Sequence, residues 1–189
     1  MRRIRVAVVH GVNLDQLGRR NPDHYGAGSL RDLERQVEAW AAELGWAVRF
    51  FQTNHEGSFV EYLHRAEGLV DGLILNPGAW THYSWAIHDA LELASLPAVE
   101  VHLSDVGRRE EWRRRSVISE LCLATVSGQG VAGYRTALEA LSGHLLPDEP
   151  ETPADATPEA PASVAPSSAS ADDAAPSTDS PTPTDLPTP

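Results

Sequence analysis

The sequence predicts an α/β fold built around a doubly wound parallel sheet. Short, nearly all-apolar runs alternate along the chain with longer segments whose apolar residues recur at helical spacing. A strand that helices cover on both faces is apolar throughout, and Leu73-Ile74-Leu75 forms such a run before Asn76-Pro77-Gly78 ends it. Because the two kinds of segment alternate, we expect parallel strands joined by right-handed helical crossovers.

The first half of the chain predicts two strands and two helices. Residues 4–9 and 46–52 are the predicted strands, and the second is less apolar, as expected nearer the edge of a sheet. Ser29 should cap a helix over residues 30–44, whose apolar side chains share one face before Gly45 stops it. Ser58-Phe59-Val60-Glu61 fits a capping box, which predicts a second helix to about residue 69.

The second half predicts three strands and two helices. In order, these are a strand at 73–75, a helix from about His82 to Ala94, a strand at 97–101 that leads to His102, a strand at 121–126 and a helix from 131 to about 145. Together the segments fit a flavodoxin-like, five-stranded sheet of order 2-1-3-4-5. Its switch point lies between the first and third strands, so the loop after His10 should lie beside the loop after Asn76. Ligands bind just beyond the carboxyl ends of the strands in such sheets.

Composition divides the chain into two parts. Residues 147–189 carry nine acidic residues and no basic one, so the net charge of −12 leaves residues 1–146 near −3. The second part consists mainly of Pro, Ala, Ser, Thr, Asp and Glu, and it cannot bury enough apolar surface to offset the entropy of ordering. We therefore expect a folded domain at 1–146 and a disordered acidic tail at 147–189.

Residue counts exclude several classes of chemistry. All fifteen basic residues are arginine, so the chain has no lysine for a Schiff base or for a phosphate-binding loop. Cys122 is the only cysteine, so an internal disulfide is excluded and a reducing compartment is indicated. Its neighbours are apolar, which predicts that Cys122 packs in the core within the last strand. The longest apolar runs are too short to span a membrane. The run after Arg5 ends in His10-Gly11 without a cleavage site, so we expect a buried first strand and a cytoplasmic protein.

Side chains capable of acid–base chemistry gather at the predicted strand ends. Glu100 and His102 are two residues apart in a strand, so they face the same side. A carboxylate beside an imidazole fixes its tautomer and favours the imidazolium, as a general acid requires. Tyr25 becomes a candidate base where Arg19 or Arg20 of the same loop stabilises the phenolate. The other polar groups at these strand ends are Asn13, Asn54, His55, Glu56, Asn76, His82 and Ser104.

Three further patterns leave alternatives open. Gly128-Gln129-Gly130-Val131-Ala132-Gly133 resembles a dinucleotide-binding turn, but no later strand supplies the ribose-binding acid. We favour a tight turn with close helix packing, and a nucleotide- or flavin-binding module is the alternative. Arg113-Arg114-Arg115 lacks a wider basic field, which argues against nucleic acid and favours a grip on a small anionic or hydroxylated ligand. The histidines show no metal-binding spacing, so no metal is expected. Another alternative is an interaction protein whose acidic tail is the functional part.

Several separate stretches match a known family in order and spacing. They are Gly11-Val12-Asn13-Leu14, Leu17-Gly18-Arg19-Arg20, Tyr25-Gly26, Asn54-His55-Glu56-Gly57, Asn76-Pro77-Gly78-Ala79, Thr81-His82, Asp89-Ala90, Glu100-Val101-His102-Leu103-Ser104, Arg109-Glu110-Glu111 and Arg113. Through them, residues 4–146 resemble type II 3-dehydroquinate dehydratase, an enzyme of the shikimate and quinate pathways. The fold of that family is flavodoxin-like, in agreement with the strand and helix pattern.

The resemblance implies an anti elimination of water from 3-dehydroquinate, which gives 3-dehydroshikimate through an enolate. Tyr25 would be the base, Arg20 would stabilise its phenolate, and Asn13 would hold the water that stabilises the enolate. His102, oriented by Glu100, would protonate the departing hydroxyl group. The implied substrate-binding residues are Asn76, His82, Asp89, Leu103, Ser104, Arg113 and, in the neighbouring part of the site, Arg109. Such a reaction needs a base, an acid and enolate stabilisation but no metal or cofactor.

The resemblance further implies a homododecamer built from trimers, in which Asp89 reaches into a neighbour's site. The partner would be the small-molecule substrate, with no nucleic acid and no membrane. The chain departs from the usual family pattern at a few positions. These are His10 and Val12 in place of Asn and Pro, Asn21 in place of Glu, His88 in place of Arg, Asp105 in place of Asn, and Gly107 in place of His.

Overall fold

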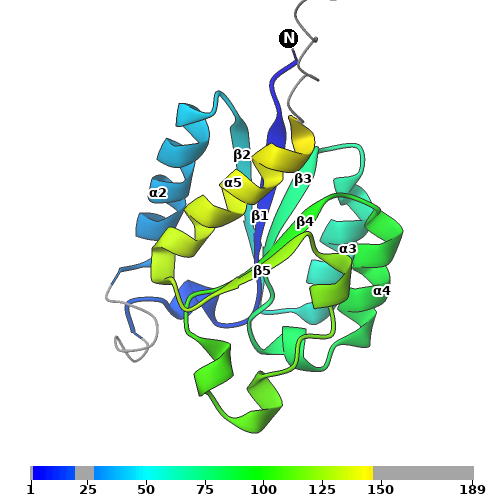
Figure 1. Ribbon diagram of the computed structural model, residues 1–189. Helices are drawn as coiled ribbons and strands as arrows, with labels where there is room; N and C mark the ends of the chain where they lie inside the picture. Colours follow the sequence, from blue (N-terminus) through cyan, green and yellow to red (C-terminus); the bar gives the residue numbers. More distant parts are fainter. Residues whose placement is uncertain (1, 20–27, 147–189) are drawn as a thin grey trace, which may run out of the picture. The chain divides into compact units, whose positions relative to one another are not determined.

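A parallel five-stranded sheet forms the centre of the protein (Figure 1), whose computed structural model describes residues 2–19 and 28–146. The strand order is β2-β1-β3-β4-β5, as the sequence predicts, and β2 lies at an edge. The strands are β1 Arg5–His10, β2 Ala47–Gln52, β3 Gly72–Asn76, β4 Ala98–His102 and β5 Ala124–Ser127. The sequence-based expectations for Arg20, Asn21, Tyr25 and the acidic tail concern residues outside the described ranges.

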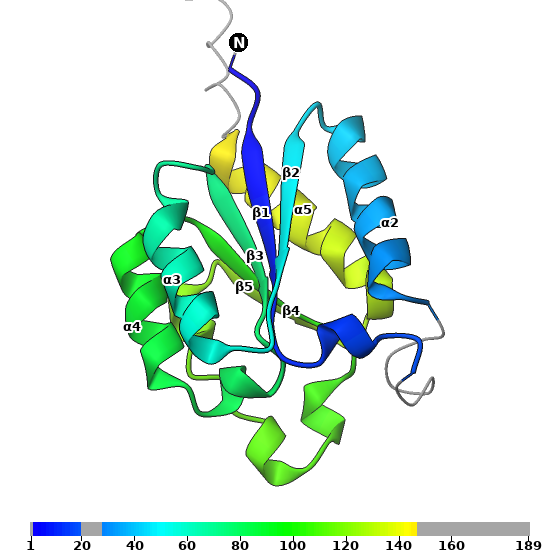
Figure 2. The ribbon, with the colours of Figure 1, turned by 180° about the vertical axis from the view of Figure 1, so that it is seen from behind.

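Helices cover both faces of the sheet, as Figures 1 and 2 show from opposite sides. Their bounds are α2 Leu30–Glu43, α3 Glu56–Ala66, α4 Trp85–Ala94 and α5 Gly133–Leu145. The helices α2 and α5 pack on one face, and α3 and α4 pack on the other. Within the described ranges, none of the helices is both long and apolar enough to cross a membrane.

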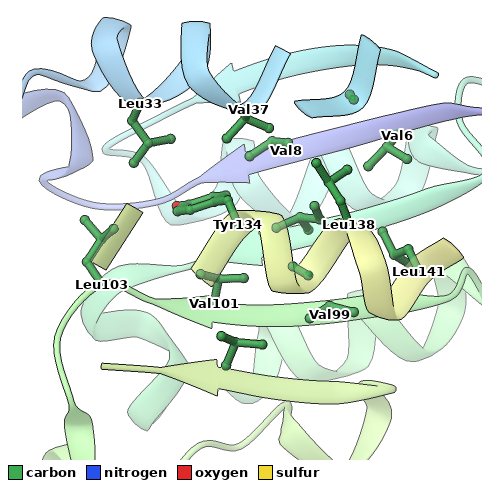
Figure 3. Packing of buried hydrophobic residues seen from close by; sticks show 14 of the residues in the cluster. Val6, Val8, Leu33, Val37, Val99, Val101, Leu103, Tyr134, Leu138 and Leu141 are labelled. Atoms are coloured by element: carbon green, nitrogen blue, oxygen red, sulfur yellow. The ribbon is translucent and has the colours of Figure 1, made fainter. Parts of the chain in front are cut away.

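The core alternates along β1 between the two faces. Val6 and Val8 pack towards α2 and α5 (Figure 3), whereas Ala7 and Val9 pack towards α3 and α4. Because both faces are buried, the strand is apolar at every one of these positions, which is the pattern that predicts it.

The first helix begins where the sequence predicts. The Ser29 side chain accepts a hydrogen bond from the Asp32 amide, and the Asp32 side chain accepts one from the Ser29 amide, so the capping is reciprocal. The cap therefore fixes the start of α2 at Leu30.

Two predicted helix starts are wrong. The helix α3 begins at Glu56 after His55, so Ser58 and Glu61 lie inside it and form no capping box. A turn fixed by the His55 amide, which donates to Thr53 Oγ1 at 3.0 Å, places the start earlier. The helix α4 begins at Trp85, because Ser84 caps it by accepting from the Ile87 amide.

The corrected start of α4 separates two predicted site residues. His82 ends a preceding 3₁₀ helix, Gly78–His82, whereas Asp89 lies on α4. The two residues therefore lie on separate helices and not on the single helix that the sequence predicts from about His82 to Ala94.

The last strand is also shorter than predicted, because Ser119–Leu121 forms a 3₁₀ helix and β5 starts at Ala124. Cys122 accordingly precedes the strand, although it still packs against the core. Burial, together with the nearby negative charge of Glu100, raises the pKa of the Cys122 thiol to about 12.

Candidate active site at the carboxyl ends of β1, β3 and β4

The loops after β1 and β3 lie against each other, as the predicted switch point requires. His10 and Asn76 are partners in the parallel register, and the Gly11 amide donates to the Asn76 carbonyl oxygen at 2.8 Å. A Cβ atom on Gly11 would lie 2.2 Å from the Pro77 carbonyl oxygen. Gly78, at φ 68°, similarly passes the Val12 carbonyl oxygen. Only residues without a side chain allow the two loops this approach.

These loops form the floor of a cavity of about 80 Å³. Four of the predicted site residues line it, namely Asn13, Asn76, Leu103 and Arg113. Asn13 has φ 65°, in the left-handed region, and its amide donates to Asn54 Oδ1 at 2.8 Å. The loops after β1, β2 and β3 are thereby tied together around the cavity.

A second hollow, of about 220 Å³, shares Arg113 with the first and is lined by His82 and His102. The two imidazole rings stack with their centroids 6.1 Å apart. His82 Nδ1 lies 2.7 Å from the Arg115 carbonyl oxygen, so Nδ1 carries the hydrogen and Nε2 remains for a ligand. Burial lowers the pKa of His82, and the neighbouring His102 and Arg113 act in the same direction.

His102 and Glu100 form the predicted pair. His102 Nε2 lies 2.8 Å from Glu100 Oε1, and both side chains are buried at the end of β4. Because Nε2 bonds to the carboxylate, Nδ1 is the ring nitrogen left for proton transfer to a ligand.

Three hydroxyl groups complete the surroundings of the Glu100 carboxylate. Thr81 donates to Oε1, Ser116 donates to Oε2 at 2.8 Å, and Thr125 donates to Oε2 at 3.2 Å. Burial alone would raise the pKa of Glu100, but the bonds from His102, Thr81 and Ser116 outweigh it and hold the pKa below its ordinary value. The carboxylate therefore stays ionised beside His102. The sequence analysis gives none of the three a role, although Thr81 lies in one of the stretches that match the family; no spacing marks Ser116 or Thr125.

The segment between β4 and β5 covers this end of the sheet in Figures 1 and 2 and holds the predicted arginines. Arg109 Nη1 donates to Ser104 Oγ at 3.4 Å, and Arg113 Nε lies 3.0 Å from Glu110 Oε2. Trp112, which the sequence-based reasoning also missed, packs edge-on against His82 at 5.4 Å.

The glycine-rich turn after β5 is a structural element of this site. The Gly128 amide donates to the carbonyl oxygens of His102 and Ser104, and the Gly130 amide donates to that of Leu103. A Cβ atom on Gly133 would lie 3.2 Å from Val126. Since backbone N–H groups that would cradle a phosphate are engaged by the loop after β4, the turn serves helix packing and loop placement, as favoured from the sequence.

Some predicted residues are not brought to this site. Asp89 is exposed on α4, pairs with His88 at 3.2 Å and lines neither cavity. His88 also contacts Glu120, and these two acidic partners raise the pKa of His88. Asp105 caps a short 3₁₀ helix by accepting from the Gly107 amide. Tyr25 and Arg20 belong to residues 20–27, which lie outside the described ranges. Among the described side chains, no cluster of three or more His, Cys, Asp or Glu is placed to hold a metal.

The described groups suit a proton transfer to an oxygen-rich, anionic ligand. Amide groups of Asn13 and Asn76 and the guanidinium of Arg113 face one cavity, and the buried His102–Glu100 pair adjoins it. A buried imidazole with an ionised carboxylate behind it can supply a proton to a leaving group.

Comparisons with known proteins agree with this geometry. The model of the family described as dehydroquinase class II matches residues 4–142. The 3-dehydroquinate dehydratase of Thermotoga maritima is 50% identical over 142 residues, which cover 75% of this chain and 97% of the relative. That of Pelobacter propionicus is 49% identical over 139 residues, covering 73% and 93% respectively.

Solved structures of similar fold are also type II dehydroquinases. The crystal structure of type II dehydroquinase from Propionibacterium acnes has a TM-score of 0.71 at 37% identity, covering 75% of this chain and 99% of that one. The type II dehydroquinase from Butyrivibrio crossotus has a TM-score of 0.72 at 36% identity, covering 74% and 98%. The match in sequence, fold and strand-end chemistry shows that this chain belongs to the class II dehydroquinase family.

Proposed function

We propose that this chain is a hydro-lyase that converts 3-dehydroquinate to 3-dehydroshikimate by anti elimination of water through an enolate. The relatives named above carry this activity in their names, and the family match spans most of the chain. The observation in the structure that carries the proposal is the buried His102–Glu100 pair beside a cavity lined by Asn13, Asn76 and Arg113.

Each half of the elimination has its own group. Tyr25, as a phenolate stabilised by Arg20, removes the proton α to the ketone. Asn13 holds a water that stabilises the enolate oxygen. His102 then protonates the departing β-hydroxyl group, which leaves as water, while the ionised Glu100 stabilises the imidazolium that donates the proton.

The remaining predicted residues bind substrate. Asn76 and the backbone amides of Leu103 and Ser104 hold its carboxylate and hydroxyl groups, and His82 and Arg113 hold ring hydroxyl groups, with Arg109 at the neighbouring part of the site. The position of Leu103 and Arg113 on the cavity wall and the Arg109–Ser104 contact support these roles.

Asp89 acts in the site of a neighbouring subunit of a homododecamer built from trimers. Its exposure on α4, away from both cavities of its own subunit, supports this role. Tyr83, Trp85 and Leu93 are large apolar side chains on the same stretch that remain exposed in the single chain, as residues at a subunit contact would be.

The catalytic domain comprises residues 1–146, and residues 147–189 have no part in catalysis. Support comes from the relatives, whose nearly complete length corresponds to about three quarters of this chain. The enzyme acts in the shikimate pathway of chorismate and aromatic amino acid biosynthesis or in quinate breakdown. Its compartment is the cytoplasm, and the single unpaired Cys122 is compatible with that location.

The product provides the test, because the elimination creates a carbon–carbon double bond conjugated with the ketone. Purified full-length protein mixed with 3-dehydroquinate should develop the ultraviolet absorbance of a conjugated enone. No absorbance change at high enzyme concentration would exclude the proposal. A parallel thermal-shift measurement with flavin mononucleotide should show no stabilisation, which separates this function from a flavin-binding module.

A further inference from the structure

A buried hydrogen-bond chain runs behind the cavity from α5 to the end of β1. Tyr134 is fully buried, and its hydroxyl oxygen lies 3.0 Å from Asn76 Nδ2 and 3.4 Å from His10 Nδ1. Figure 3 shows its ring between α5 and the strands, among Leu33, Val37 and Val8. Asn76 and His10 are partners in the β1–β3 register, so one hydroxyl group from α5 reaches both strand ends.

The direction of each hydrogen bond in this chain follows from the atoms involved. The Gly78 amide donates to Asn76 Oδ1 at 3.3 Å, so the carbonyl side of the amide is fixed and Nδ2 faces Tyr134. Nδ2 is only a donor, so the Tyr134 oxygen accepts from it and must donate its own hydrogen elsewhere. Among the described residues, the other hydrogen-bond partner of this hydroxyl group is His10 Nδ1, which therefore accepts.

His10 is thereby fixed as the neutral tautomer with its hydrogen on Nε2. Its ring is fully buried and stacks on Phe50, and burial lowers the pKa of His10 to about 3, so it is neutral at pH 7. Nε2 makes no hydrogen bond to any described residue, and the Glu34 carboxylate lies 3.9 Å away. A buried N–H group without a partner, such as Nε2–H here, lowers the stability of the fold. The same tautomer leaves Nδ1 as an acceptor for the Tyr134 hydroxyl group.

We propose that Tyr134 and His10 are positioning residues that hold the Asn76 side chain with its amide nitrogen, rather than its oxygen, available to the cavity. Of the two hydrogens on Nδ2, one is used by Tyr134, and the other has no partner among the described residues. Asn76 then binds an acceptor oxygen of the substrate at this point. This inference rests on the proposed dehydratase function and adds two residues to it.

The informative variant is Tyr134→Phe, which removes one oxygen atom and leaves the ring in the core. We expect KM for 3-dehydroquinate to rise roughly 3- to 10-fold, as for one lost hydrogen bond, with kcat nearly unchanged. In an Asn76→Ala background, adding Tyr134→Phe should have no further effect on KM, because Tyr134 acts through that amide. Tyr62→Phe removes the same atom from a half-buried ring that stacks on Phe51 on the other side of the sheet, and it should leave KM unchanged.

A purely structural role for Tyr134 gives different results. The Tyr134→Phe variant would then lose thermal stability with wild-type KM, or its effect on KM would be the same with and without Asn76, and either outcome would overturn the proposal.

A second measurement does not depend on turnover. In ¹⁵N spectra of histidine-labelled full-length protein, one ring should be an Nε2–H tautomer that does not titrate between about pH 5 and 8. That signal should vanish in His10→Asn, and its Nδ1 resonance should move in Tyr134→Phe, which removes the donor. A charged ring or an Nδ1–H tautomer would overturn the inference. Failure of the dehydratase assay with the expected spectrum would instead count against the proposed function.

Discussion

Replacing Glu100 by glutamine tests whether the ionised carboxylate supports proton donation by His102. The substitution keeps size and shape, and the hydroxyl groups of Thr81, Ser116 and Thr125 can turn to accept from the new amide. The negative charge 2.8 Å from His102 Nε2 is lost. A hydrogen bond to a charged group contributes about 1.5–3 kcal/mol, so kcat should fall roughly 10- to 150-fold.

The assay is the initial rate of enone formation at saturating 3-dehydroquinate for wild type and Glu100→Gln. Glu139→Gln, which removes an exposed carboxylate on α5, is the matched control and should behave as wild type. Urea unfolding of each variant separates a catalytic effect from a folding defect.

A folded Glu100→Gln protein with wild-type kcat would refute this role of the carboxylate. The buried carboxylate would then be a structural anchor for the three hydroxyl groups and not a support for His102.

Four further outcomes are expected. Tyr25→Phe should lower kcat by more than about 100-fold, because the general base is lost, while equilibrium binding of substrate stays near wild type; wild-type turnover would remove Tyr25 as the base. The folded-state pKa of His10, about 3, is below its ordinary value of 6.5, so only the unfolded chain takes up this proton as pH falls. Between about pH 6 and 4 the free energy of unfolding of the wild type should therefore fall by about 1.4 kcal/mol per pH unit more than that of His10→Asn. Urea unfolding at a series of pH values measures both, and an equal dependence on pH in the two proteins would contradict this. Gly11→Ala should lower the free energy of unfolding by about 3 kcal/mol, because the new Cβ atom overlaps the Pro77 carbonyl group. Gly57→Ala, where α3 leaves open space, should not lower it, and equal melting temperatures of the two variants would contradict the expectation for Gly11. Deletion of residues 147–189 should leave kcat and KM unchanged in the enone assay, and lost activity would give the tail a catalytic role.

The sheet could be predicted because its signals are local. Apolar runs broken by glycine, proline or polar residues mark the strands, and alternation with helices fixes parallel pairing. Helix starts were less predictable, because several side chains near each start can cap it. The Ser58–Glu61 pattern is a valid cap in isolation, but the turn at Thr53 and His55 begins α3 earlier. In the same way, α4 begins at Trp85 after its cap Ser84, and not at His82.

Part of the candidate site could also be predicted from local signals. The pairing of Glu100 with His102 follows from two-residue spacing in one strand, and the meeting of Gly11 with Pro77 follows from the switch point. Both conclusions need only the identity and order of the strands.

The sequence by itself therefore determines which strands exist, which residues end them and which family the motifs resemble. Only the tertiary structure decides what those residues touch. The packing of separate elements brings Ser116 to Glu100 and Tyr134 to Asn76. It also brings Tyr134 to His10, which lies 124 positions away in the sequence. A hydroxyl group carries no local pattern that names its partner, because its bond is set by where two elements meet in space and by which buried polar atoms must be satisfied there.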